Sequence, residues 1–213
     1  KISKRLTFIE PLDILYMTDN SSLIKINSEE YINNNKKTKI YKSQKVILKN
    51  KPHIEKKSKI KIGYFSAEFH NHPVLHTMKE IFKNHDKSKF ELYAFSHGKK
   101  KSDVWREKIK PYFKKFYVIN DMTDIEAAGL ARNEKIDIAV NLTGLTKDSR
   151  TGIFIKRAAP IQINYLGYPG TIGIKSMDYI IADKIIIPDG EKKYYSEKVK
   201  YLPECYISEA KDL

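Results

Sequence analysis

Short apolar runs alternate with amphipathic stretches from Lys59 to the end of the chain. A continuous apolar run predicts a buried strand, and apolar residues three or four positions apart predict a helix that packs on a sheet. The predicted strands cover residues 60–65, 90–95, 115–119, 136–141, 161–165, 177–182 and 199–202. The predicted helices cover residues 74–84, 102–112, 124–134 and 151–158. This alternation is typical of crossover connections, so we predict a doubly wound α/β domain with a mostly parallel sheet.

The first 58 residues have a different pattern, rich in Lys, Asn and Ser and without any Gly. Residues 22–33 carry apolar side chains at helical spacing, which predicts a helix. Residues 49–59 have the composition of a charged linker around Pro52. We therefore predict two parts: an N-terminal helical segment with a charged linker at 1–58, and the α/β domain at 59–213.

Length and composition narrow the class of protein. A chain of 213 residues with 41% hydrophobic residues can bury one good core, which argues against disorder. No stretch approaches the roughly 20 apolar residues that span a bilayer. The apolar patch at 6–9 is cut short by Glu10 and Pro11, so it makes no signal-peptide core. These features predict a cytoplasmic protein without a membrane partner, and the single Cys205 excludes an internal disulfide and a cysteine-built metal site.

The net charge of +14 leaves a second function class open. A noncatalytic basic module could hold an anionic partner such as nucleic acid, because clustered Lys and Arg displace counterions from phosphates. Here the lysines are spread along the chain among Asn and Ile, as expected for an ordinary solvated surface. No nucleic-acid recognition motif accompanies them, so nucleic acid is the disfavoured partner.

Polar and glycine residues concentrate after the predicted strands, where parallel sheets bind ligands. The loop at 66–73 holds a carboxylate with His70 and His72, and His76 follows. A neutral imidazole beside a substrate hydroxyl is a candidate general base, and the alternative is a histidine that caps the next helix or packs. Metal binding is a further alternative on the spacing of these three histidines. It would need more ligands from later strands, where only His85 and His97 remain.

The turn at 167–171 has two glycines and a proline. Such a turn can bring backbone N–H groups close to a departing phosphate, although an ordinary tight turn has the same composition. The chain has no glycine-rich dinucleotide or nucleoside triphosphate motif, so those cofactors are disfavoured.

Several motifs in a fixed order are more informative than any one of them. They are KIGYFSAEF at 61–69, NHP at 71–73, NLTGLT at 141–146, RAAPIQ at 157–162, LGYPGT at 166–171 and MDYIIAD at 177–183. Together they closely resemble the O-GlcNAc transferase and SPINDLY glycosyltransferases, from about Lys59 to Pro203. Residues 11–32 resemble the helical segment that precedes the first catalytic lobe in these enzymes.

The resemblance implies a GT-B architecture in which this chain is the Rossmann-like first lobe with a short N-terminal helical appendage. The second, nucleotide-binding lobe is missing after Leu213, so residues 1–213 alone should show negligible turnover. The parent would transfer a sugar to a Ser or Thr hydroxyl, or another side chain, of a protein or peptide acceptor. UDP-GlcNAc is the expected donor, with UDP-glucose and GDP-fucose as the alternatives that the sequence leaves open. It would need no tightly bound cofactor and no metal.

The resemblance also implies site residues. His72 matches the family histidine that is proposed as catalytic base. The residues expected along the substrate and donor cleft are Asn71, Pro73, Asn141, Gly144, Thr146, Gly167, Tyr168, Pro169, Gly170 and Thr171.

Overall fold

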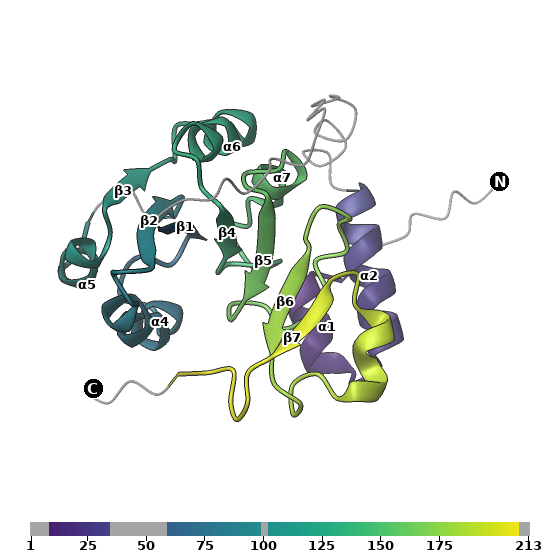
Figure 1. Cartoon of the computed structure of the whole chain (residues 1–213). Helices are drawn as coiled ribbons and strands as arrows, with labels where there is room; N and C mark the ends of the chain where they lie inside the picture. Colours follow the sequence, from purple (N-terminus) through teal and green to yellow (C-terminus); the bar gives the residue numbers. More distant parts are fainter. Residues whose placement is uncertain (1–8, 35–58, 99–101, 209–213) are drawn as a thin grey trace.

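The computed structural model describes residues 9–34, 59–98 and 102–208, and within them seven strands form one sheet (Figure 1). Every neighbouring pair is parallel. The spatial order is β3-β2-β1-β4-β5-β6-β7. The strands are β1 (Ile60–Ser66), β2 (Phe90–Ser96), β3 (Lys115–Val118), β4 (Ile138–Asn141), β5 (Ile161–Tyr165), β6 (Tyr179–Ala182) and β7 (Lys198–Tyr201). The predicted doubly wound, parallel architecture is confirmed.

The helices follow the strands as the sequence pattern predicts. They are α1 (Pro11–Met17), α2 (Ser21–Asn34), α4 (Pro73–Asn84), α5 (Val104–Ile109), α6 (Asp124–Asn133) and α7 (Thr151–Ile155), with 3-10 turns η1 (Lys110–Tyr112) and η2 (Asp189–Tyr194). Capping residues set several ends: Asp103 accepts the Arg106 N–H at 2.9 Å, and Thr123 forms a capping box with Glu126. α7 is shorter than predicted, because Arg157 has a left-handed backbone (φ 56°) that a helix cannot contain.

Alternate side chains of each central strand enter different cores on the two faces of the sheet. In β1, Ile62 and Tyr64 pack beneath α4 and α5, whereas Phe65 packs beneath α6 and α7. Phe65 stacks on Phe95 with ring centroids 4.3 Å apart, and Phe154 of α7 meets its ring edge-on. The two-sided burial explains why the central strands appear as nearly continuous apolar runs.

The two N-terminal helices pack on the second half of the sheet rather than standing apart from it (Figure 1). Ile32 of α2 is 1% exposed within the core beneath α6 and α7. The hydroxyl of the fully buried Tyr168 lies 3.1 Å from Ser28 Oγ and donates to the Pro11 carbonyl at 3.3 Å. The predicted boundary near residue 58 stays a prediction, and residues 49–58 of the predicted linker lie outside the described residues.

Replacing Tyr168 by phenylalanine is expected to lower the free energy of unfolding by about 1–2 kcal/mol. The Ser28 hydroxyl and the Pro11 carbonyl would each lose the buried Tyr168 hydroxyl as hydrogen-bond partner. Urea denaturation followed by circular dichroism measures the change. Tyr16→Phe is the matched control, since Tyr16 is 82% exposed and should give no shift. Equal midpoints for the two variants would show that the Tyr168 hydroxyl does not hold the N-terminal helices.

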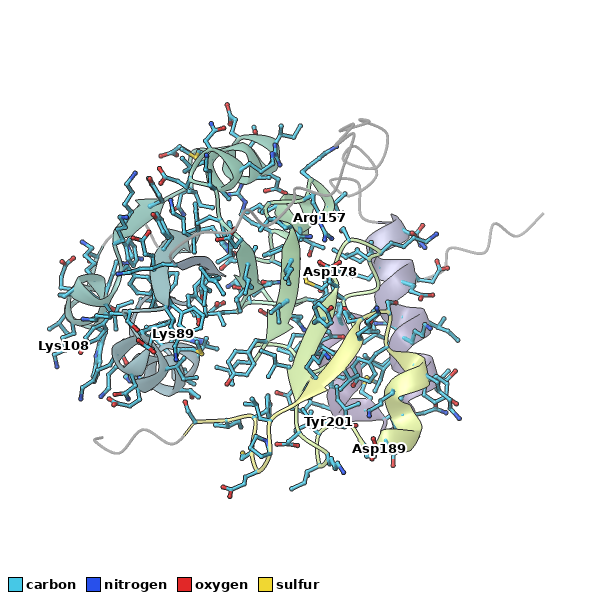
Figure 2. The ribbon with its side chains drawn as sticks, in the orientation of Figure 1. Lys89, Lys108, Arg157, Asp178, Asp189 and Tyr201 are labelled. Atoms are coloured by element: carbon cyan, nitrogen blue, oxygen red, sulfur yellow. The ribbon has the colours of Figure 1, made fainter. Side chains whose placement is uncertain are left out.

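An ion pair joins the segments that lead into the amino ends of β5 and β6. Figure 2 shows the side chains of Arg157 and Asp178 together, and their closest atoms are 2.7 Å apart. Arg157 also donates to the carbonyls of Ser176 and Pro160.

In the described part of the chain, no helix combines the length and the apolar character needed to cross a membrane.

Candidate functional site

A cavity of about 490 Å³ opens at the carboxyl ends of β1, β4 and β5. Its lining comes from α1, from the start of α4 and from the loops after these strands: Leu12, Tyr16, Ala67, Glu68, His70, His72, Val74, Leu142, Thr143, Thr146, Lys147, Asp148 and Gly167. Strand β1 pairs with β2 on one side and β4 on the other. From β1 the sheet is built outward through β2 to β3, and then in the opposite direction from β4 to β7. The cavity therefore lies at the topological switch point, where open parallel sheets bind their ligands.

The carboxyl group of Glu68 is buried in the cavity wall, with 8% of the residue exposed. Ser66 Oγ and Thr143 Oγ1 each donate to its Oε2 at 2.7 Å. The same hydroxyls accept the N–H groups of Glu68 and Ala67, at 3.0 and 2.9 Å. Burial raises the pKa of Glu68 above its usual range, although the two hydroxyl hydrogen bonds and the charge of His72 act in the other direction.

His72 caps α4 and lines the same cavity. Its Nδ1 accepts the Val74 N–H at 3.3 Å. A ring nitrogen that accepts a hydrogen bond carries no proton, so the neutral imidazole has its proton on Nε2. In this arrangement His72 is a hydrogen-bond donor. To act as a base at Nε2, the neutral ring must instead carry its proton on Nδ1, which breaks the capping bond.

The neighbours of His72 in the sequence face away from the cavity. The Asn71 N–H donates to Asp103 at 2.7 Å, and its side-chain oxygen lies 2.8 Å from His76 Nε2. Asn71 and Pro73 are exposed, and Pro73 opens α4. Both residues set the direction of the chain around His72.

Asn141 and Gly144 shape the loop after β4. Asn141 Oδ1 accepts the N–H groups of Thr143 and Gly144, at 3.2 and 3.1 Å, which closes a tight turn. Gly144 has a left-handed backbone (φ 64°), and a β-carbon there would lie 2.2 Å from Cβ of Tyr168. Thr146 follows on the cavity wall and donates to the Thr143 carbonyl at 2.9 Å.

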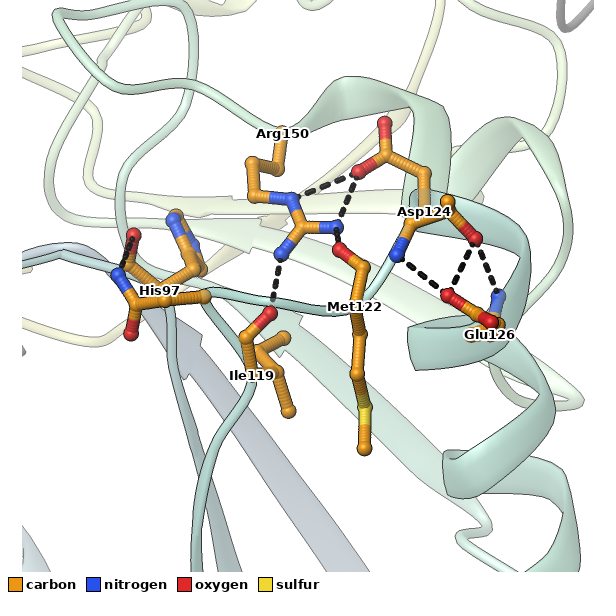
Figure 3. A network of polar contacts seen from close by, with 8 residues as sticks. His97, Ile119, Met122, Asp124, Glu126 and Arg150 are labelled. Carbon is orange, nitrogen blue, oxygen red and sulfur yellow. Dashed lines mark hydrogen bonds and ion pairs between the residues drawn. The ribbon is translucent and has the colours of Figure 1, made fainter.

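Arg150 ties this loop to the region after β3 (Figure 3). Its guanidinium binds Asp124 Oδ1 at 2.7 Å and donates to the carbonyls of Ile119 and Met122, at 2.8 and 2.7 Å. His97 lies buried beside this network. The cavity wall at 146–148 is thus held by bonds to a distant part of the chain.

The loop at 167–171 faces the interior more than the cavity. Only Gly167 lines the cavity. Tyr168 is fully buried, and Thr171 Oγ1 donates to the buried Glu197 at 2.6 Å. Pro169 accepts a hydrogen bond from the Tyr195 hydroxyl at 3.0 Å, and a β-carbon at Gly170 would lie 2.6 Å from the Tyr168 hydroxyl oxygen. These residues build the wall that supports the cavity.

The structure therefore brings three of the expected site residues, His72, Thr146 and Gly167, to the cavity. Thr143 also lines the cavity, as do Leu12 and Tyr16 of α1, and none of the three was predicted as a site residue. Glu68 is the carboxylate noted in the loop after β1, to which no role was assigned from the sequence. The position of Glu68, two residues after the end of β1, was the feature of the sequence that could have marked it as a site residue.

Metal binding was the alternative for the first histidines. The rings of His70 and His72 have centroids 5.6 Å apart. Across residues 9–34, 59–98 and 102–208, no group of three His, Cys, Asp or Glu side chains is arranged to hold a metal ion.

Comparison with known proteins gives one family and consistent relatives. The model of glycosyl transferase family 41 matches residues 3–212. A probable UDP-N-acetylglucosamine–peptide N-acetylglucosaminyltransferase SEC of Arabidopsis thaliana is 35% identical over 149 residues, which cover 70% of this chain and 15% of that protein. The corresponding Caenorhabditis elegans enzyme is 34% identical over 158 residues, covering 72% and 14%.

A probable SPINDLY enzyme of Arabidopsis thaliana is 34% identical over 154 residues, covering 70% of this chain and 16% of its own length. Among solved structures, a mutant O-GlcNAc transferase of Thermobaculum terrenum superposes with a TM-score of 0.75 at 24% identity, covering 88% of this chain and 35% of that one. This last likeness bears on the fold alone.

Proposed function

This chain belongs to glycosyl transferase family 41, and we propose that it forms the acceptor-side lobe of an enzyme that transfers a sugar from a nucleotide donor to a protein hydroxyl. The chain spans about a seventh of the length of the relatives it matches. The activity is therefore proposed for a longer protein, in which a second lobe binds the nucleotide and completes the cleft.

The observation that carries this proposal is the cavity at the switch point of the sheet. It combines an imidazole, a buried carboxyl group and hydroxyl side chains, on walls fixed by bonds to several elements. Glycosyl transfer needs a group that orients and deprotonates the acceptor hydroxyl, and rigid walls that exclude water. The cavity supplies an imidazole and a carboxyl group for the first task, on walls held by hydrogen bonds.

UDP-GlcNAc is the donor we propose, and a Ser or Thr hydroxyl of a peptide is the acceptor. The relatives named above are described as transferring N-acetylglucosamine from this donor to peptides. No tightly bound cofactor or metal enters the proposal. We place the protein in the cytoplasm, as the sequence predicts.

His72 orients the acceptor or assists its deprotonation in this proposal, together with a donor-facing wall at Thr146 and Gly167. Replacing His72 by asparagine in the longer protein is expected to lower turnover about 100-fold or more. Asparagine is a good N-cap, so the start of α4 and the stability should be retained. Sugar transfer to a peptide acceptor is the measurement.

His76→Ala is the matched control, because His76 lies one helical turn beyond His72 and is not part of the cavity wall. It should leave turnover close to that of the wild type. Unchanged turnover in His72→Asn would remove the imidazole from the reaction. Absence of any sugar transfer by the wild-type longer protein, with a range of nucleotide sugars, would refute the proposed function itself.

A further inference from the structure

Glu68 is the buried carboxyl group of the cavity, and its surroundings orient it. The hydroxyl protons of Ser66 and Thr143 both point to Oε2, because each hydroxyl oxygen already accepts a backbone N–H. Oε2 is thereby held in place by the protein. Oε1 is left for a ligand in the cavity that Glu68 lines.

His72 complements this carboxyl group. The capping bond from Val74 occupies Nδ1, so the neutral ring presents Nε2–H as a donor. Glu68 and His72 both line this cavity. The cavity wall therefore holds both a proton acceptor and a hydrogen-bond donor. A substrate hydroxyl can donate to the first and accept from the second at the same time.

We propose that Glu68 accepts the proton of the acceptor hydroxyl, while Nε2–H of His72 donates a hydrogen bond that orients the same substrate. The inference rests on the proposed sugar transfer. The hydroxyl proton passes to Oε1 as the hydroxyl oxygen forms a bond to the anomeric carbon. The bond from that carbon to the donor phosphate breaks, and its electron pair stays on the nucleoside diphosphate.

Burial supports this role, since it raises the pKa of Glu68 toward the pH at which a carboxylate is an effective base. The other titratable side chains on the cavity wall are His70, His72, Lys147, Asp148 and Tyr16. Lys147, Asp148 and Tyr16 are exposed. Among the carboxyl groups that line the cavity, Glu68 is therefore the one shielded from water.

The test is Glu68→Gln in the full-length protein, with UDP-GlcNAc and a peptide acceptor. Glutamine has the same shape, and its carbonyl oxygen can still accept both hydroxyl hydrogen bonds. Turnover is expected to fall about 100-fold or more, while the KM for the donor stays within about twofold. A purely structural role would instead appear as lost stability, which urea denaturation of the same variant measures.

A second variant changes the pKa of Glu68 and leaves its carboxyl group in place. Thr143→Val deletes one hydrogen bond that favours the ionised carboxyl group, so the pKa of Glu68 should rise. The acidic limb of the profile of kcat/KM against pH should then move to higher pH by about one unit. Thr143→Ser keeps the hydroxyl and should keep the wild-type limb.

Retention of half or more of the turnover in Glu68→Gln would overturn the inference. It would also be overturned if Thr143→Val did not shift the acidic limb of the profile of kcat/KM against pH. An active wild type with an active Glu68→Gln would overturn this inference alone. A wild type without sugar transfer would overturn it together with the proposed function.

Discussion

Replacing Gly167 by alanine is expected to lower the free energy of unfolding by about 3 kcal/mol, because the new methyl group has no space. A β-carbon there would lie 1.9 Å from the carbonyl oxygen of Leu142 and 3.3 Å from Cα of Thr143. Both atoms belong to the backbone directly after β4, so the loops after β4 and β5 must separate. The cavity lies between these loops, and its wall would open with them.

Urea denaturation at neutral pH measures this loss. Gly190→Ala is the matched control, because a β-carbon at Gly190 would have no atom within 4 Å. That variant should change stability by less than about 0.5 kcal/mol. If Gly167→Ala unfolds at the same urea concentration as Gly190→Ala, the close approach of the two loops is not a constraint on the fold.

The architecture was predictable because it depends on local patterns. Strands such as β1 are buried on both faces, so they appear as short apolar runs that no surface helix would have. Apolar residues three or four positions apart mark helices such as α4 within a few positions. The parallel direction of the strands follows from the helices between them, since consecutive parallel strands must be joined by crossovers.

The orientation of the loop at 167–171 was not predictable from its composition. Glycines that admit a phosphate and glycines that admit a tyrosine ring look the same in a sequence. The partners that decide the matter are far along the chain: Ser28 for Tyr168, and Glu197 for Thr171. Gly144 and Gly170 make room for Tyr168 in this structure, which is a packing role.

The role of His72 shows the same limit. The sequence left two interpretations open, a base or a helix cap, and the structure has a cap that also lines the cavity. The consequence for chemistry depends on which ring nitrogen accepts the Val74 N–H, a geometric fact that no spacing of residues contains. The partners of Glu68 are likewise hidden, since Thr143 follows it by 75 residues.

His97 is a buried imidazole that makes the fold sensitive to acid. It is 7% exposed and lies beside the Arg150 network (Figure 3). Burial, and then the positive charge of Arg150, lower the pKa of His97 to about 3, although a hydrogen bond with the backbone of Asp148 acts in the other direction. Nδ1 of His97 has no hydrogen-bond partner among the described residues. A proton on His97 would thus be a buried charge next to an arginine.

The free energy of unfolding should therefore fall as the pH drops from about 6.5, because the unfolded chain binds a proton at His97 that the fold excludes until about pH 3. His97 alone contributes a loss of about 1.4 kcal/mol for each pH unit in this window. His97→Gln keeps a donor near the position of Nε2 and cannot titrate, so its stability should fall less steeply. Urea denaturation of both proteins between pH 7 and pH 4 measures the difference, in which contributions from the carboxyl groups cancel. Parallel curves would show that His97 accepts its proton inside the fold.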